Sequence, residues 1–466
     1  MIYNLSLREE GALPYNEHIS MKRAHRVFLI GIGGIGMSAL ARLYKSRGWR
    51  VAGSDAGRSE ITDELNKEGI RVAIGHAGKH ITKDLDAVIY NRAISKDNPE
   101  MIAANKIGIR AVPYAEALGK LTEEYTTIAI TGSHGKSTTT AFAGLALMKG
   151  GLDPTILIGT KLKELGGKNM RLGKSEYLVL EADDFGAAFT AYSPTVAIIT
   201  NIDREHLDFY KNFNNVKKAF LKFLARVRPG GLMILNHDDA PLRGLRKSIE
   251  RIARKNAVTV VWYSRESTAG MNVKRIISLP GAHNVANATA VYELGRFLGI
   301  PEKKVLSAIH AYRGAWRRME RRGTFHGAPV FDDYAHHPTE IAATLAGFRE
   351  KFPSKKILCV FQPHQAQRLA LLFKDFQHAF DDADETLILP LYHVAGRDAV
   401  IPNRDSEALV RAIQKQQPRK PIFYLAEPEK LKDAVMALNR KTVSFRSLVI
   451  VMMGAGDIVK LTEKLL

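Results

Sequence analysis

Cysteine and long apolar runs are both scarce in this sequence. Cys359 is the only cysteine among 466 residues, so an internal disulfide is excluded. Its apolar neighbours in Ile357–Phe361 indicate a small buried strand residue. No stretch reaches the roughly 18 apolar residues that a membrane-spanning helix needs. The first 25 residues are polar with acids and a proline, unlike a secretory signal, so we expect a cytoplasmic protein without membrane insertion.

Acidic residues are outnumbered. The chain has 68 Lys and Arg against 48 Asp and Glu, a formal net charge of +20. Basic side chains are dispersed, and the modest cluster Arg317-Arg318 with Arg321-Arg322 forms no arm or stripe. Dispersed positive charge favours small anionic substrates such as nucleotides over a nucleic-acid partner, which we do not expect.

Strand and helix patterns alternate along the chain in three series, which indicates βα units. At 466 residues the chain is too long for one ordinary core, and three domains fit. We expect domains at 1–122, 123–312 and 313–466. Short apolar strands are predicted at Val27–Ile30, Val51–Ser54, Ala87–Tyr90, Thr127–Ile130, Tyr177–Leu180, Val196–Ile199, Val330–Phe331, Ile357–Phe361, Thr386–Leu389 and Leu448–Met452.

A glycine-rich turn follows the first strand. Gly31, Gly33, Gly34 and Gly36 match G-x-G-x-x-G, and Asp55 ends the next strand about twenty residues later. Such glycines let the backbone approach a diphosphate, and the acid can accept a hydrogen bond from a ribose hydroxyl. A nicotinamide or flavin cofactor, another nucleotide diphosphate and a merely tight turn all remain open at this point.

A second glycine-containing loop favours ATP. It lies between the strand at Thr127–Ile130 and a helical run from Thr139 to Leu147. Backbone NH groups can cradle phosphate oxygens, Lys136 can neutralise the β- and γ-phosphates, and the Ser137 hydroxyl can coordinate Mg²⁺. The loop is a variant of the strict pattern, since Ile130 holds the first glycine position. The expected ATP-binding residues of the loop are Gly132, Ser133, His134, Gly135, Lys136, Ser137 and Thr138.

Acids and a histidine follow two further strands of the same series. Glu181, with Asp183-Asp184 after it, ends the strand at Tyr177–Leu180, and His206 comes soon after Val196–Ile199. The carboxyl ends of parallel strands meet at one edge of a sheet, where these groups can bind Mg²⁺. We therefore predict metal ligands at Ser137, Glu181 and His206.

These segments together resemble the Mur ligase family, and the resemblance covers nearly the whole chain from about residue 25. It depends on several separated motifs. They are the glycine turn with Met37-Ser38, Gly53-Ser54-Asp55, Thr131–Thr140, Glu181-Ala182-Asp183-Asp184, Gly281–Ala288, Asp332–Glu340 and Phe361-Gln362-Pro363-His364.

The resemblance implies an α/β fold of three domains: an N-terminal Rossmann-like domain, a central domain with the parallel sheet of P-loop ATPases, and a C-terminal Rossmann-like domain. It implies an enzyme that uses ATP and Mg²⁺ to join an amino acid, expected to be L-alanine, to the carboxylate of UDP-N-acetylmuramate through an acyl phosphate, in peptidoglycan precursor synthesis.

The resemblance also assigns residues. The first glycine turn would bind the UDP-sugar, with Asp55 and His76 in its pocket. His336 would help to place the amino acid, and the catalytic set would be Lys136, Glu181, His206 and His336. Further contacts to ATP would come from Asn284, Asn287, Arg318 and Asp333.

Three departures from the family pattern affect these expectations. Several branches carry a carbamylated lysine at a position where our register puts Phe220. The absence of a lysine there resembles the alanine-adding branch, although a shift of two residues would bring Lys218 or Lys222 to this position. A basic residue that commonly follows Phe-Gln-Pro-His is Gln365 here, whereas Arg368 is retained. The segment 237–280 also looks short.

Three other functions stay open. A ligase of the same family could attach a preformed peptide to the UDP-sugar during cell-wall recycling. A nicotinamide-dependent dehydrogenase would explain the first glycine turn but leave Thr131–Thr140 unused. A nucleic-acid-binding module would show binding with a steep salt dependence.

Overall fold

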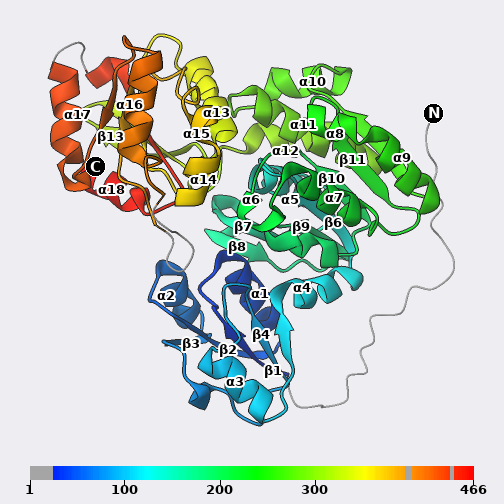
Figure 1. The fold of residues 1–466 in the computed structure, drawn as a ribbon. Helices are drawn as coiled ribbons and strands as arrows, with labels where there is room; N and C mark the ends of the chain where they lie inside the picture. The colour runs from blue at the N-terminus through cyan, green and yellow to red at the C-terminus, as the bar shows by residue number, and fades with distance from the viewer. Residues whose placement is uncertain (1–24, 394–400, 441–444) are drawn as a thin grey trace. The chain divides into compact units, whose positions relative to one another are not determined.

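The computed structural model describes residues 25–393, 401–440 and 445–466. It contains three sheets of mostly parallel strands with helices packed around them (Figure 1). One compact unit runs to Gly33 and resumes at Tyr44–Val112, and the other comprises Gly34–Leu43 and Pro113–Leu466. None of the described helices is long and apolar enough to cross a membrane. The expectation about a leader concerns residues 1–24, which lie outside the described residues.

The first sheet has the strand order β3-β2-β1-β4-β5. Phe28, Ile30 and Val88 of its strands are buried together with Met101 of α3. Strand order reverses at β1, and ligands bind in such α/β sheets beyond the carboxyl end of the strand at that point. The strands are β1 Arg26–Ile30, β2 Arg50–Asp55, β3 Arg71–Ile74, β4 Ala87–Tyr90 and β5 Ala111–Pro113, with helices α1 Ile35–Ser46, α2 Glu60–Lys67, α3 Pro99–Lys106 and, after the sheet, α4 Tyr114–Glu123.

The central sheet has the order β12-β11-β10-β6-β9-β7-β8. All its pairings are parallel except β7 with β8. The strands are β6 Thr126–Thr131, β7 Thr155–Leu162, β8 Lys168–Arg171, β9 Tyr177–Glu181, β10 Val196–Ile199, β11 Leu232–Asn236 and β12 Thr259–Tyr263. Its helices are α5 Lys136–Gly150, α6 Leu207–Tyr210, α7 Phe213–Leu224, α8 Ala240–Gly244, α9 Arg246–Lys255, α10 Thr268–Ile276, α11 Ala282–Phe297 and α12 Glu302–Ala311.

Helix α5 anchors the core of the central sheet. It starts after Gly135 and ends before Gly151, whose positive φ angles of 81° and 90° are conformations that glycine adopts without cost. Phe142 of this helix is fully buried, together with Ile128 and Ile130 of β6. The first turn of α5 is therefore held rigidly at the carboxyl edge of the sheet. It begins within the predicted ATP-binding loop, residues 131–138, which we call the phosphate loop.

The third sheet has the order β13-β14-β18-β15-β16-β17, with only the β13–β14 pairing antiparallel among the described strands. Cys359 is buried in β15, as predicted. The strands are β13 Glu320–Phe325, β14 Ala328–Asp333, β15 Lys356–Phe361, β16 Glu385–Ile388, β17 Ile422–Tyr424 and β18 Leu448–Met453. Its helices are α13 Pro338–Lys351, α14 Ala366–Leu371, α15 Phe373–Phe376, α16 Ser406–Gln416, α17 Leu431–Arg440 and α18 Ile458–Leu465.

The structure confirms the α/β class, and every predicted strand is present within a residue or two of its expected position. Two edge strands are antiparallel to their neighbours: β8 pairs with β7 and β13 with β14, each through a short connection. Segment 237–280 holds α8, α9, β12 and α10. The domain boundaries near 122 and 312 stay predictions.

Candidate functional site

The phosphate loop lies between β6 and α5, and two of its glycines are there for steric reasons. Gly132 has φ 141°, and a Cβ there would lie 2.0 Å from the hydroxyl of Thr200. A Cβ on Gly135 would lie 2.7 Å from the side-chain oxygen of Asn287. Only glycine lets the loop pass this close to β10 and α11. The NH groups of Ser133 and His134 donate to the backbone and side-chain oxygens of Asn201 at 3.1 and 2.8 Å, so it is the NH groups at the N-terminus of α5 that can face an anion.

Lys136 is folded back onto the loop. Its ammonium donates hydrogen bonds to the carbonyls of Gly132 and Ser133 at 2.7 and 3.1 Å, and to Asp184 Oδ1 at 2.8 Å. Burial would lower the pKa of Lys136, but the carboxylates of Asp184 and Asp183 outweigh it and raise that pKa. The side chain is therefore a fixed positive charge beside the loop.

The Ser137 hydroxyl and the Glu181 carboxylate meet at the first turn of α5. Ser137 Oγ donates to Glu181 Oε1 at 2.9 Å, and the NH of Gly159 donates to Glu181 Oε2 at 2.6 Å. Burial raises the pKa of Glu181, while the Gly159 hydrogen bond and Lys136 oppose that rise. Two of the three predicted metal ligands are thus in direct contact.

His206 forms a second group with Asp183 and Asp184. Their ligand atoms lie within 4.8 Å of one another, a spacing that suits one divalent cation. Among the described residues, Oδ2 of the buried Asp184 has no hydrogen-bond partner. The structure records no contact of His206 with Ser137 or Glu181, so the predicted ligands fall into two groups that Lys136 connects through its ion pair with Asp184.

His134 connects the loop to the third sheet. Its Nε2 lies 3.0 Å from Asp203 Oδ2 and its Nδ1 lies 3.2 Å from Glu340 Oε1 at the start of α13. Thr339 also donates to Asp203 Oδ2 at 2.7 Å. Burial would lower the pKa of His134, but Glu340 and Asp203 raise it to about 10. His134 is thus an imidazolium between two carboxylates.

A cavity of about 340 Å³ opens beside the phosphate loop, a volume in the range of small-molecule sites. It is lined by His134, Gly135 and Thr138 of the loop region and by four residues predicted to contact ATP. These four are Asn284, Asn287, Arg318 and Asp333. Sequence reasoning thus predicted a set of residues that the fold brings together from α11, β14 and the linker before β13.

Two residues that line the cavity, Asp333 and Arg318, are held in place by neighbouring backbone and side-chain groups. Asp333 accepts the NH groups of Met319 and Ala335 at 2.8 and 2.9 Å, and burial raises its pKa. The guanidinium of Arg318 lies 5.1 Å from the ring centre of Tyr334. The Asp333 contacts fix the linker that carries Arg318, so the guanidinium can face a ligand.

His336 lies on the third-sheet side of the site. Its Nδ1 is 2.9 Å from the carbonyl of Tyr334, and its Nε2 is 3.9 Å from Glu205 Oε2. Burial lowers the pKa of His336 to about 3, so the imidazole is neutral near pH 7. A neutral, buried imidazole can donate or accept one hydrogen bond to a polar substrate group.

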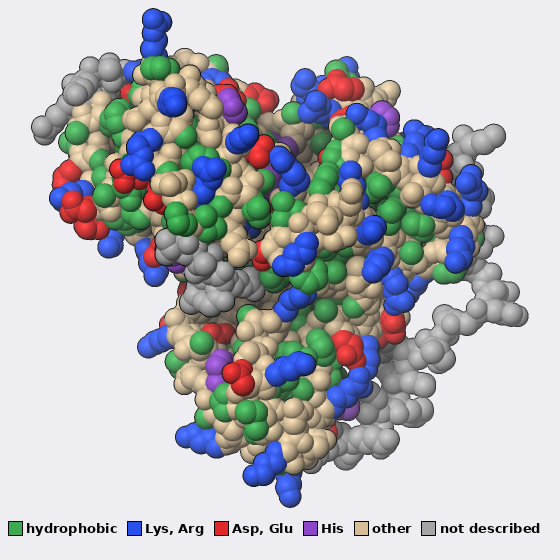
Figure 2. Space-filling model, viewed as in Figure 1, with side chains coloured by type: hydrophobic (Ala, Val, Ile, Leu, Met, Phe, Trp, Pro, Cys, Tyr) green, Lys and Arg blue, Asp and Glu red, His purple; other side chains and the backbone are tan. Residues whose placement is uncertain are grey.

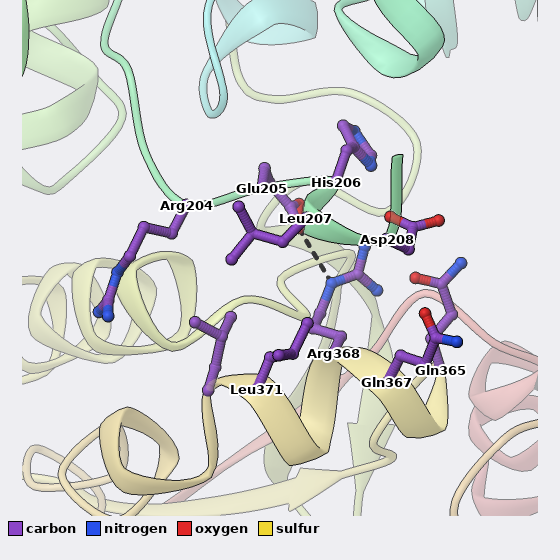
Figure 3. Close-up of a pocket in the computed structure, with 10 residues that line it drawn as sticks. Arg204, Glu205, His206, Leu207, Asp208, Gln365, Gln367, Arg368 and Leu371 are labelled. Atoms are coloured by element: carbon purple, nitrogen blue, oxygen red, sulfur yellow. Dashed lines mark hydrogen bonds and ion pairs between the residues drawn. The ribbon is translucent and has the colours of Figure 1, made fainter. Parts of the chain in front are cut away.

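A small hollow between the loop 204–208 and α14 contains a buried ion pair (Figure 3). Arg368 Nε donates to Glu205 Oε1 at 3.0 Å, and both side chains are less than 10% exposed. Arg204, His206, Gln365 and Gln367 also line this hollow. Sequence reasoning predicted neither the Glu205–Arg368 pair nor the contacts of His134 with Asp203 and Glu340. The acidic residues beside His206 and within the Asp332–Glu340 motif were the only sequence signal that could have indicated these contacts.

In the first unit, the glycine turn and Asp55 meet as predicted. Asp55 Oδ2 accepts the NH of Gly33 at 2.8 Å, and a Cβ on Gly33 would lie 2.8 Å from that oxygen. His76 follows the end of β3 by two residues, and its Nδ1 is 2.9 Å from Glu100 Oε2. Sequence reasoning missed Glu100, a fully buried carboxylate that also contacts Ser54 at 2.6 Å.

Phe220 is buried in the core of the central domain. Its ring packs edge-on against Phe189 at 5.1 Å, while Lys218 and Lys222 are exposed. Phe220 thus has a packing role in α7, and its place at the carbamylated-lysine position stays a prediction. On the face drawn in Figure 2, Lys and Arg side chains are spread widely, in keeping with the dispersed charge of the sequence.

Comparisons with known proteins cover most of the chain. Three family models match it: "Mur ligase family, catalytic domain" over residues 26–126, "Mur ligase middle domain" over 130–295, and "Mur ligase, glutamate ligase domain" over 317–456. The curated UDP-N-acetylmuramate–L-alanine ligase of Desulfosudis oleivorans is 37% identical over 95% of this chain and 98% of its own length. The relative of the same name from Aquifex aeolicus is 39% identical over 80% of this chain and 85% of its own length.

Solved structures agree with the sequence relatives. The crystal structure of a UDP-N-acetylmuramate-alanine ligase from Thermotoga maritima is similar with a TM-score of 0.74 and 27% identity, covering 94% of this chain and 98% of that one. A murein peptide ligase from Psychrobacter arcticus has a TM-score of 0.66 at 21% identity, covering 95% of this chain and 98% of that one. This second likeness concerns the fold alone.

Proposed function

The chain belongs to the Mur ligase family, and from that premise we propose that it ligates L-alanine to the carboxylate of UDP-N-acetylmuramate at the expense of ATP, in peptidoglycan precursor synthesis. The observation that carries this proposal is the similarity, over most of the chain, to relatives named for that activity, at 35–39% identity. The family is ATP-dependent, and ATP and UDP-sugars are cytoplasmic metabolites, so we propose that the enzyme acts in the cytoplasm.

The chemistry requires activation of a poor electrophile. A carboxylate oxygen of the muramyl group attacks the γ-phosphorus of ATP, which breaks the bond to the β–γ bridging oxygen and forms an acyl phosphate and ADP. The amine then attacks the acyl carbon, an amide bond forms, and inorganic phosphate leaves with the bonding electrons. The amine loses one proton in this second step.

In our proposal the phosphate loop holds the triphosphate of ATP. The NH groups at the N-terminus of α5 and the ammonium of Lys136 stabilise the charge that spreads over the transferred phosphoryl group. Lys136 must then exchange its hydrogen bond with Asp184 for phosphate oxygens. Adenine and ribose occupy the cavity lined by Asn284, Asn287 and Asp333.

The residues beside the loop suit magnesium. Asp184 Oδ2 is a buried carboxylate oxygen without a partner among the described residues, and oxygen atoms are the ligands that Mg²⁺ prefers. Ser137 and Glu181 form one set of ligands, and Asp183, Asp184 and His206 form another. When bound, Mg²⁺ supplies neutralisation of the phosphate charge.

We assign the first domain, residues 1–122, to the UDP-sugar, the second, 123–312, to ATP, and the third, 313–466, to the amino acid and to further contacts with ATP. The position of the glycine turn at the end of β1, where the strand order reverses, supports a diphosphate site there. His336, neutral because burial lowers its pKa, is the group we assign to alanine placement, with Arg368 positioning its surroundings through Glu205. Gln365 takes no part in this assignment.

Release of inorganic phosphate from ATP tests the proposal. Phosphate should appear only when UDP-N-acetylmuramate and an amino acid are both present, with L-alanine preferred over glycine, L-serine and a tripeptide. The Lys136→Ala variant should lower kcat by at least about 100-fold, the size of effect seen when one donor to a developing anion is removed. ATP turnover that is independent of the sugar nucleotide would refute the proposal.

Two arms of the same assay address the alternatives. A preference for the tripeptide over L-alanine would assign the chain to peptide attachment. Tight NADH binding without ATP binding would favour a dehydrogenase. The matched control is Lys247→Ala, which removes an exposed lysine on α9 and should leave kcat unchanged.

A further inference from the structure

A second cavity, of about 570 Å³, lies on the other side of the linker that enters β13. Its lining comes from Lys163 and Glu164 after β7, from the linker and β13, from β14, and from the end of α13. Gly314 and Met319 line both this cavity and the one proposed for ATP. We call it the linker cavity, and its volume lies within the range of sites for small molecules.

Positive charge predominates around the linker cavity. Five cationic side chains line it, against the two carboxylates of Glu164 and Glu320. Glu320 is already engaged, because its Oε2 accepts the backbone NH of Arg317 at 2.9 Å. The cations are Lys163, Arg313, Arg321, Lys351 and Lys355.

Two of the five cations have structural duties. Arg313 donates to backbone carbonyls at the end of α12, including that of Tyr312 at 3.3 Å. Lys355 donates to the carbonyl of Arg446 at 2.9 Å. These contacts are typical of side chains that cap helix ends and loops, so a ligand need not be invoked for them.

The other three cations are not neutralised. Across the described part of the chain, the side chains of Lys163 and Arg321 make neither a hydrogen bond nor an ion pair. The ammonium of Lys351 lies over the rings of Phe331 and Phe352 at 5.6 and 5.8 Å. Burial lowers the pKa of Lys351, and repulsion from Arg313 and Arg321 lowers it further.

We propose that the linker cavity binds a small molecule carrying phosphate groups, with Lys163, Arg321 and Lys351 as its anion contacts. These cations come from three segments that are distant in sequence and line one cavity, where a bound anion would relieve their mutual repulsion. The rings of Phe331 and Phe352 add an apolar wall against which a planar or aliphatic part of the ligand can pack.

The site is placed to influence ATP binding. The linker residues Arg317 and Met319 have φ angles of 56° and 48°, a left-handed conformation that is uncommon for residues with a side chain. Arg318 between them lines the ATP cavity. A ligand that moves this strained segment would alter the contact with ATP, and ATP would alter that ligand's affinity by the same factor.

Inorganic pyrophosphate, a compact phosphate-bearing anion, is the probe for the test. The full chain is first saturated with a non-hydrolysable ATP analogue and excess Mg²⁺, and pyrophosphate is then titrated by calorimetry. One further site should appear in the wild-type protein. Arg321→Glu and Lys163→Glu should each weaken it at least about tenfold, whereas Lys247→Glu, a charge reversal on the distant helix α9, should not.

Absence of a second site would overturn the proposal, as would equal weakening in the Lys247→Glu control. Arg321 and Lys163 are exposed, so their variants should melt within about 2 °C of the wild type. A second readout is the KM for ATP. Pyrophosphate should change it by different factors in the wild-type and Arg321→Glu proteins. Because these residues lie outside the proposed ligase site, failure here leaves the ligase proposal standing.

Discussion

At the scale of single residues, the phosphate loop is defined by charges that are partly or wholly buried. Lys136 is paired with Asp184 and His134 with Asp203 and Glu340, so each cation of the loop has a carboxylate partner. Burying a charge is costly unless it is paired and hydrogen-bonded. In the proposed function, the acids that hold Lys136 and His134 in place compete with phosphate for Lys136.

We predict that the His134→Gln substitution lowers the free energy of unfolding by an amount that depends on pH. The folded-state pKa of His134, about 10, exceeds the ordinary value of 6.5, so its contribution is complete below pH 6.5 and disappears as pH rises toward 10. The partner acids have lowered pKa values, so their contribution disappears in acid. The variant should lose about 3 kcal/mol at pH 6, and less at pH 9.

Thermal unfolding of both proteins from pH 5 to 10 measures this difference. His378→Gln, which changes an exposed histidine in the third sheet's surroundings, is the control and should show little effect at any pH. A difference between wild type and His134→Gln that grows from pH 6.5 to 10 would contradict the assignment of the raised pKa.

At the scale of elements, the strand–loop–helix unit β6–α5 determines where phosphate can bind. Neighbouring elements close in on the loop: Thr200 follows β10, and Asn287 belongs to α11. The rings of Phe189 and Phe220 are buried against each other and hold α7 against the segment that follows β9. The loop's shape thus depends on close approach of backbone, which glycine alone permits.

Gly132→Ala should distort this unit. The new Cβ would clash with Thr200 Oγ1, and the φ of 141° is unfavourable for alanine. We expect a loss of about 1–3 kcal/mol of folding free energy and at least about tenfold weaker ATP binding, measured by denaturant unfolding and calorimetry.

The matched control for that substitution is Gly244→Ala, at the end of α8, where a Cβ meets nothing within 4 Å. It should be neutral or raise stability by about 0.4–1 kcal/mol, because alanine restricts the unfolded chain. Equal ATP affinity of Gly132→Ala and wild type would contradict the proposed role of the loop.

At the scale of the whole molecule, the second compact unit joins two sheets through polar contacts at the site. The loop after β10 supplies Asp203 and Glu205, and the helices α13 and α14 beside the third sheet supply Thr339 and Arg368. Arg204 adds an exposed ion pair with Asp375 at 2.9 Å. Asp203 and Glu205 are close in sequence to His206, a proposed metal ligand. Their contacts therefore couple the arrangement of the two sheets to the geometry of the proposed metal site.

Breaking the buried pair should cost far more than breaking the exposed one. Arg368→Met leaves the Glu205 carboxylate buried without its partner and should lower the free energy of unfolding by about 3–5 kcal/mol. Arg204→Met should cost less than about 1 kcal/mol, since that pair is solvated. Denaturant unfolding measures both losses.

A double-mutant cycle separates the ion pair from general packing. Adding Glu205→Leu to Arg368→Met removes the unpaired charge, so the double variant should be more stable than Arg368→Met alone. Strictly additive losses would show that the two side chains do not stabilise each other.

Much of the fold was predictable from local sequence, because buried parallel strands are short apolar runs and phosphate turns need glycine. Val27–Ile30, Thr127–Ile130 and Val196–Ile199 all lie in strands as expected. The antiparallel edge strands β8 and β13 were not predicted, since Lys168–Arg171 and Glu320–Phe325 are polar and lack the apolar pattern of buried strands.

The sequence by itself determined the α/β class, the two glycine turns and the family, because these depend on residue types at fixed short spacings. Only the tertiary structure decided which side chains contact one another at the site. It put His206 with Asp183 and Asp184 rather than with Ser137, bound His134 to Glu340, and gathered the cations of the linker cavity. The physical reason is that such contacts join segments far apart in the chain, and they form only once the sheets and their connections have brought those segments together.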